Sequence, residues 1–250
     1  MTGAEALVRT LVACGIEACF ANPGTSEMHF VSALDRVGGL RCVLGLAEGV
    51  VSGAADGYAR MAGKPAAILL HCGPGLANAL SNLHNARRAR SPVVAIVGDH
   101  ATHHRAWDAP LTADVEGTAR PYSDWVRTAL SARTVAADGA AAVQAARSPP
   151  GQIATLILPA DTAWTEGGVP AAPLPIPSPL PPAPAQVETA ARILRRGGAE
   201  VLLLLGGAAL SEAGQRAAFR IAAATGAGAP APKTDPPPPP RRRRLPHPRR

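Results

Sequence analysis

The sequence predicts an α/β protein with a doubly wound, mainly parallel six-stranded sheet and helices on both faces. Two observations carry this prediction. Apolar runs of strand length alternate with longer segments of helical periodicity, and this alternation is typical of parallel sheets with helical connections. The 250 residues also supply enough apolar side chains to bury a sizeable core.

The predicted elements follow from that alternation. Strands are expected where short apolar runs occur, at residues 17–21, 41–45, 66–71, 93–97, 125–128 and 153–158. Helices are expected at residues 4–13, 26–37, 47–62, 76–89 and 137–146, with a further short helix after the polar loop at 100–110. Six strands are enough for a complete domain, which we expect to occupy residues 1–165.

Composition divides residues 166–250 into a linker, a partial domain and a tail. Residues 170–184 contain eight prolines in fifteen positions, so 166–185 is predicted to be an extended linker. Residues 186–225 show a helix–strand–helix pattern, with the strand in the run EVLLLLGGAAL at 200–210. They predict the start of a second α/β domain that stays incomplete. Residues 226–250 lack apolar periodicity and predict a disordered tail.

The positive charge is concentrated in that tail. The formal net charge is +7, and Lys233 and six arginines against Asp235 give the tail about +6. A nucleic-acid-binding tail is one reading, but we favour a disordered segment left by truncation or a frame error, so no nucleic-acid partner is expected. No apolar run reaches the roughly 18 residues of a membrane span, so no membrane partner is expected either.

The cysteines and histidines do not predict a metal site. Four cysteines occur without any CxxC pair, which favours a reduced, cytoplasmic setting. His103 and His104 are adjacent, unlike the i, i+4 histidines of an HExxH zinc site. We therefore expect no metal ligands in this chain.

Three loops at predicted strand ends carry unusual residues. They are ANPGTSE (21–27), the connection that delivers Glu48 to the start of a helix, and LLHCGPGLAN (69–78) with His71. Ligands of open parallel sheets bind at such carboxyl ends. Each loop also has a plain interpretation: a tight turn, a helix-capping acid and a satisfied polar histidine. GxGxxG and GxxxxGK[ST] are both missing, which disfavours a nucleotide-phosphate loop.

Taken in order, three segments are more specific. NPGTSE, LAEGVVSGAADGYARMAGKPA and GPGLANALSNLHNARRARSPVVAIVGD resemble the N-terminal pyrimidine-binding domain of thiamine diphosphate-dependent 2-keto acid enzymes. Acetolactate synthase large subunits are the most similar members, and benzoylformate decarboxylase and pyruvate decarboxylase belong to the same family. The resemblance covers residues 4–158, with a weaker one over 186–225.

The resemblance implies a catalytic role for Glu48. In this family a carboxylate at that place hydrogen-bonds N1′ of the coenzyme's aminopyrimidine and favours the tautomer whose N4′ removes the thiazolium C2 proton. The coenzyme then performs the carbanion chemistry on a small 2-oxo acid. The resemblance also implies that Pro23 and Gly24 lie against the pyrimidine, with Gly75 and Asn78 nearby.

His71 is the second catalytic candidate that the resemblance implies. It falls where benzoylformate decarboxylase has an active-site histidine, and imidazole can carry a proton near neutral pH. Acetolactate synthases usually have a small or hydroxyl residue there. Carboligation to acetolactate and decarboxylation of another 2-oxo acid therefore both remain open.

The resemblance also implies what must lie elsewhere. In the family, Mg²⁺ and the diphosphate are held by a separate domain with a GDG motif, which is not found here, and the active site forms between subunits of a homodimer or larger oligomer. We expect a truncated enzyme that is inactive alone. The alternatives are a subunit of a split enzyme and a non-enzymatic module that binds nucleic acid through its arginines. Flavin binding is left open.

Overall fold

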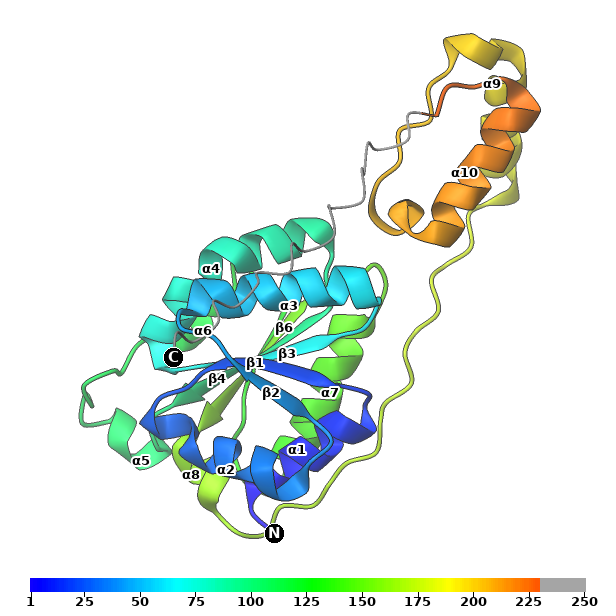
Figure 1. Cartoon of the computed structure of the whole chain (residues 1–250). Helices are drawn as coiled ribbons and strands as arrows, with labels where there is room; N and C mark the ends of the chain where they lie inside the picture. Colours follow the sequence, from blue (N-terminus) through cyan, green and yellow to red (C-terminus); the bar gives the residue numbers. More distant parts are fainter. Residues whose placement is uncertain (230–250) are drawn as a thin grey trace, which may run out of the picture. The chain divides into compact units, whose positions relative to one another are not determined.

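The computed structural model describes residues 1–229, and within it the chain separates into two compact units. The first, Met1–Pro179, holds one six-stranded sheet in the order β2-β1-β3-β4-β6-β5, and every neighbouring pair is parallel (Figure 1). The strands are β1 (Ala18–Asn22), β2 (Arg41–Leu44), β3 (Ala66–Leu70), β4 (Val93–Asp99), β5 (Trp125–Thr128) and β6 (Ile153–Pro159). The predicted fold class is confirmed.

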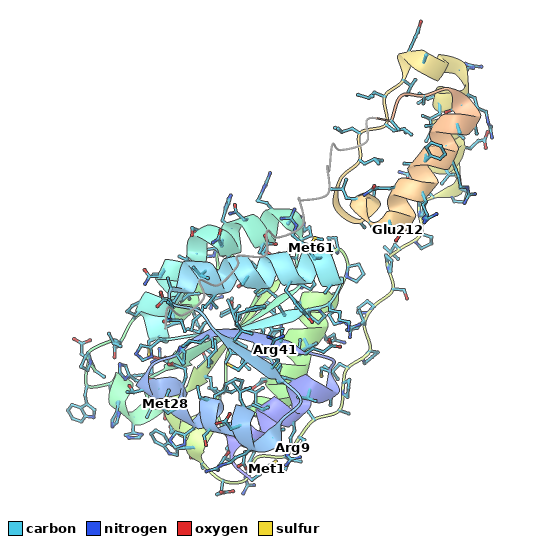
Figure 2. All side chains as sticks on the ribbon, viewed as in Figure 1. Met1, Arg9, Met28, Arg41, Met61 and Glu212 are labelled. Carbon is cyan, nitrogen blue, oxygen red and sulfur yellow. The ribbon has the colours of Figure 1, made fainter. Side chains whose placement is uncertain are left out.

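Helices cover both faces of this sheet (Figure 1). One face carries α3 (Glu48–Ala62), α4 (Cys72–Ala89) and α6 (Val115–Ala119), and the other carries α1 (Gly3–Ala13), α2 (Met28–Val37), α7 (Val135–Arg147) and α8 (Ala160–Trp164). The short α5 (Thr102–Arg105) and the 3₁₀ turn η1 (Thr25–Glu27) lie in the loops after β4 and β1. Met61, near the end of α3, is 89% exposed (Figure 2).

The core is built on the alternation of β3 and β4, which are buried along their whole length. Ala67 and Leu69 of β3 pack into the cluster beneath α1 and α7, whereas Ile68 and Leu70 point into the cluster beneath α3 and α4. Strands buried on both faces read as continuous apolar runs, and AAILL and VVAIVGD are such runs.

The chain order of the strands reverses between β1 and β3. From β1 the chain passes to β2 on one side, and then to β3 on the other side. Such a switch point leaves a crevice beyond the carboxyl ends of the two central strands. The loops after β1, β2 and β3 therefore converge at one edge of the sheet.

Two predictions differ from the structure: the start of one helix and the presence of one strand. The helix expected from residue 76 begins at Cys72, so Gly73, Pro74 and Gly75 form its first turn instead of a loop. Proline is tolerated there because the first N–H groups of a helix have no intrahelical acceptor. The strand expected within 200–210 is not formed either. A strand needs a paired neighbour, and within residues 1–229 this run pairs only through an isolated bridge between Leu202 and Gly228.

The second unit is described from Leu180 onward. It contains α9 (Pro184–Gly197) and α10 (Glu212–Thr225), with the 3₁₀ turns η2 (Gly198–Glu200) and η3 (Gly207–Leu210) between them. Leu202 and Leu204 are 63% and 88% exposed. Most of the predicted disordered tail, residues 230–250, lies outside the described residues.

The proline-rich segment at the end of the first unit has no helix or strand over residues 169–179. It is tied to the domain by two hydrogen bonds: the Ala171 N–H donates to Thr10 Oγ1, and Gln144 Nε2 donates to the Pro175 carbonyl. None of the helices between residues 1 and 229 combines the length and apolarity of a membrane-spanning segment.

Candidate functional site

The structure brings the residues singled out from the sequence to the same edge of the sheet. Pro23 and Gly24 follow β1, Glu48 opens α3 after β2, and His71 caps α4 after β3. Gly75 and Asn78 lie in the first two turns of α4. They meet at the switch point where the open sheet leaves a crevice.

Glu48 is the first residue of α3, and the hydrogen bonds among residues 1–229 include none from the helix backbone to its carboxylate. Instead, Oε2 accepts a hydrogen bond of 3.2 Å from Asn78 Nδ2. The position of a Cβ on Gly75 would lie 3.6 Å from Oε1. Glu48 is half-buried, and it therefore presents one carboxylate oxygen to the space beside Gly75.

Close packing of α3 on α4 fixes the position of Glu48. Asn82 Nδ2 on α4 donates to the Gly49 carbonyl at 2.7 Å. The Ser52 hydroxyl, which is fully buried, lies 3.0 Å from the carbonyls of both Glu48 and Ala79. Small residues on α3 allow this approach, because the position of a Cβ on Gly53 would lie only 3.0 Å from Asn82 Nδ2.

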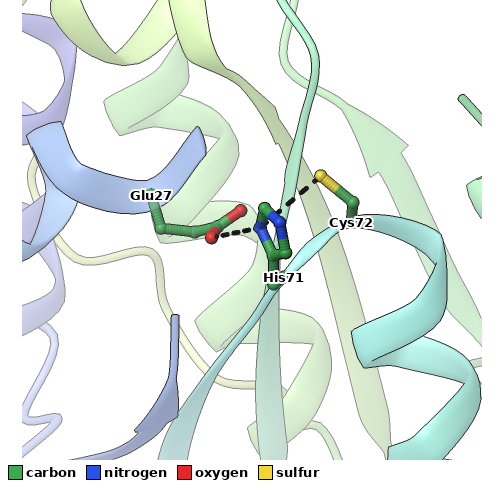
Figure 3. Close-up of side chains that lie close together, drawn as sticks. All are labelled: Glu27, His71 and Cys72. Atoms are coloured by element: carbon green, nitrogen blue, oxygen red, sulfur yellow. Dashed lines mark hydrogen bonds and ion pairs between the residues drawn. The ribbon is translucent and has the colours of Figure 1, made fainter. Parts of the chain in front are cut away.

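Glu27 is a site residue that the sequence did not reveal. Its side chain is fully buried, and Oε2 lies 2.8 Å from His71 Nδ1 (Figure 3). The Gly24 N–H donates to the same oxygen at 2.7 Å. Oε1 has no hydrogen-bond partner among the described residues. Burial raises the pKa of Glu27, and the bonds from Gly24 and His71 oppose that shift.

Gly24 and Gly98 make room for this pair. The position of a Cβ on Gly24 would lie 2.5 Å from three atoms of the His71 ring, so the backbone of Gly24 supports one face of the imidazole. A Cβ on Gly98 would collide with Glu27 Oε1. The signal in the sequence was weak: Glu27 follows Gly24 by three residues, the spacing of a helix-capping acid.

Cys72 completes the cluster. Its Sγ lies 3.7 Å from His71 Nδ1 and donates to Ser26 Oγ at 3.5 Å. Burial raises the pKa of this thiol to about 11. The Glu27, His71 and Cys72 ligand atoms all lie within 4.8 Å of one another. However, the 2.8 Å separation of nitrogen and oxygen is that of a direct hydrogen bond, and two ligands of a tetrahedral zinc ion would stand about 3.3 Å apart.

Comparisons with known proteins point to one family. Residues 1–119 match the family described as thiamine pyrophosphate enzyme, N-terminal TPP binding domain. A protein of Mycobacterium tuberculosis, provisionally named acetolactate synthase large subunit IlvX, is 56% identical over 227 residues, which are 91% of this chain and 43% of that protein. Benzoylformate decarboxylase of Pseudomonas aeruginosa is 33% identical over 148 residues, covering 59% of this chain and 28% of the decarboxylase.

Solved structures agree with these relatives. An enzyme of Mycobacterium smegmatis, provisionally described as thiamin diphosphate-dependent, matches with a TM-score of 0.79 and 28% identity over 92% of this chain and 44% of its own. A 4-hydroxybenzoylformate decarboxylase of Rhodococcus jostii matches with a TM-score of 0.69 and 26% identity, over 78% of this chain and 38% of its own. The chain thus spans less than half the length of each of these relatives.

Proposed function

We propose that the crevice at the switch point receives the aminopyrimidine end of thiamine diphosphate, because the chain carries the N-terminal TPP-binding domain of the thiamine pyrophosphate enzymes. The observation that carries this proposal is the placement of Glu48. Its carboxylate bonds to Asn78 and lies beside Gly75, and the Cβ of His71 lies beside the same glycine.

The residues present fit a flat heterocycle. A methyl group on Gly75 would stand 3.5 Å from His71 Cβ and 3.6 Å from Glu48 Oε1, in ordinary contact with both. The glycine is therefore not demanded by crowding within the chain, and its missing side chain leaves room for a ligand. Leu46 and Val50, on either side of Glu48 in the sequence, are 92% and 61% exposed and offer apolar surface to a ring.

Each residue then has a distinct role. Glu48 would hold a ring nitrogen of the pyrimidine through a proton shared with its carboxyl group, and Asn78 orients that group through Oε2. Pro23 and Gly24 border the ring, and His71 carries a proton near the substrate through Nε2. When bound, thiamine diphosphate supplies a nucleophilic carbon for the keto group of a small 2-oxo acid.

The diphosphate and its Mg²⁺ require other ligands. Mg²⁺ prefers six oxygen ligands in octahedral geometry, and the one three-residue ligand group found within residues 1–229 offers nitrogen and sulfur as well as oxygen. The diphosphate-binding half is therefore expected to come from outside this domain, in a homodimer or a larger assembly. The four free cysteines favour the cytoplasm as the setting.

Titration of the ¹⁵N-labelled chain with thiamine diphosphate and Mg²⁺ tests the site. Amide shifts are expected around Glu48, Gly75 and Asn78. Glu48→Gln should weaken binding about 10- to 150-fold, because a hydrogen bond to a charged group contributes about 1.5–3 kcal/mol. Glu166→Gln, on a side chain that is 76% exposed and pairs with the N-terminus, should leave binding unchanged. Equal affinities of Glu48→Gln and the wild type would refute the role of Glu48.

His71 favours a second candidate reaction over carboligation to acetolactate, namely simple decarboxylation of an aromatic 2-oxo acid. An imidazole beside a carboxylate can return a proton to the carbon that has lost carbon dioxide. Carbon dioxide release should be measured with pyruvate and with benzoylformate, first on the chain alone and then with a diphosphate-binding partner. Acetolactate formation from pyruvate would favour the first candidate, and benzaldehyde formation would favour the second.

A further inference from the structure

We propose that Glu27 is a positioning residue that fixes the tautomer of His71, so that Nδ1 carries the proton and Nε2 is left free for a ligand. This inference rests on the proposed function only for the use made of Nε2. The assignment of the tautomer follows from the contacts within the chain.

Glu27 Oε2 has two hydrogen-bond partners. This oxygen lies 2.7 Å from the Gly24 nitrogen and 2.8 Å from His71 Nδ1. A backbone N–H can only donate, so Oε2 accepts the bond from Gly24. The hydroxyl oxygen of a protonated carboxyl is a poor acceptor, so any proton on Glu27 resides on Oε1. Nδ1 must then be the donor to Oε2.

The contact of Cys72 with the same ring nitrogen is the weaker of the two. Cys72 Sγ lies 3.7 Å from Nδ1, and a thiol is a weak donor. If the thiol donated to Nδ1, the imidazole proton would have to move to Nε2. A bond to a carboxylate is roughly twice as strong as one between neutral groups, so the Glu27 contact prevails.

Packing restrains both Glu27 and the His71 ring. Glu27 is fully buried, and the backbone of Gly24 lies against the face of the imidazole. The ring is thus restrained at its Nδ1 edge and on one face, while 24% of the His71 side chain stays exposed. Within residues 1–229 Nε2 forms no hydrogen bond. A neutral ring in this state offers a lone pair at Nε2, and after protonation it offers a proton there.

Long-range ¹H–¹⁵N correlation spectra of the histidine rings of the full chain test this assignment. Spectra should be recorded near pH 8.5, about two units above the usual histidine pKa of about 6.5. In the wild type, His71 should show a protonated Nδ1 and an unprotonated Nε2. Glu27→Met, which removes the acceptor from an unbranched side chain of similar length, should give a loss of the Nδ1 proton in favour of Nε2–H.

Glu27→Gln is the matched control, since its amide oxygen can still accept from both donors, and the wild-type tautomer should persist. A wild-type ring protonated at Nε2 would overturn the proposal even if Glu27→Met failed to fold. An unchanged tautomer in a folded Glu27→Met variant would overturn it as well. The ligand-free spectra do not depend on coenzyme. If the tautomer is as assigned but thiamine diphosphate leaves the Glu48 and His71 signals unmoved, the proposed function fails and this inference stands.

Discussion

Two glycines flank His71, and alanine at each should have opposite effects on stability. The position of a Cβ on Gly24 would lie 2.5 Å from Cγ, Nδ1 and Cε1 of the ring. Ordinary carbon contacts need about 3.5 Å, so the ring must move about 1 Å along its normal. A sideways shift of that size tilts the 2.8 Å bond to Glu27 by about 20°, because the bond lies near the ring plane. Overpacking of this kind costs about 1–3 kcal/mol.

Gly75→Ala meets no such obstacle. The added methyl group would contact His71 Cβ at 3.5 Å and Glu48 Oε1 at 3.6 Å. Gly75 lies within α4, where alanine is favoured over glycine by about 0.5–1 kcal/mol. The free energy of unfolding should therefore rise in Gly75→Ala and fall in Gly24→Ala, with a difference of about 1.5–4 kcal/mol between the two variants.

Urea denaturation followed by circular dichroism measures these free energies. Coenzyme titration then separates stability from function. Gly75→Ala should be the more stable variant and yet bind thiamine diphosphate more weakly, because its methyl group fills the space proposed for the pyrimidine. If Gly24→Ala were as stable as the wild type, the tight contact with the His71 ring would be wrong. If Gly75→Ala bound the coenzyme normally, the pyrimidine could not lie beside Glu48.

Three further predictions concern Glu27, two cysteines and Ile96. Burial raises the pKa of Glu27 above its reference of 4.5. The wild type should therefore lose stability relative to Glu27→Gln as the pH rises from 4.5 through the raised pKa. Urea midpoints of the two proteins that keep a constant difference between pH 4 and pH 8 would contradict this. The neighbouring thiol of Cys19, its register partner on β1, lowers the pKa of the exposed Cys42, whereas burial raises that of Cys72 to about 11. Peptide mapping after brief alkylation at neutral pH should therefore find Cys42 modified more than tenfold faster than Cys72. Ile96→Ala, at a fully buried position of β4, should cost about 2–5 kcal/mol in urea denaturation, and a loss below 1 kcal/mol would show that the site collapses around the cavity.

The sheet was predictable because each of its central strands is a short apolar run that is visible in the local sequence. AAILL and the VVAIV part of VVAIVGD are apolar on both faces, and each strand is followed by a helical connection to a parallel strand. The start of α4 was not predictable in this way. A Gly-Pro-Gly run is common in loops. The start of a helix also tolerates it, because the N–H groups that precede the first helical bond, which Gly75 donates to His71, have no intrahelical acceptor.

The run EVLLLLGGAAL shows the limit of the same reasoning. Its apolar content is typical of a buried strand, but strand formation depends on neighbours that a sequence window cannot reveal. In the described residues, only Gly228 pairs with it, and Leu204 stays 88% exposed. Composition therefore predicted an apolar segment correctly and its secondary structure wrongly.

The Glu27–His71 pair was missed for a related reason. The two residues lie 44 positions apart, on connections that follow different strands, and only the parallel pairing of β1 with β3 brings them together. Family resemblance singled out Glu48 and His71 because their sequence surroundings are distinctive, but it said nothing of the residue that orients the imidazole. A buried acid in a short polar turn looks like a capping residue until its partner is known.

Gly24 and Gly75 both lie beside His71, but for different reasons. Gly24 is demanded by the fold, since any larger residue would displace an imidazole whose Nδ1 is held by a buried carboxylate. Gly75 is not demanded by the fold, since alanine would fit and would favour the helix. Forgoing that gain at a position beside the Glu48 carboxylate agrees with the ligand proposed above.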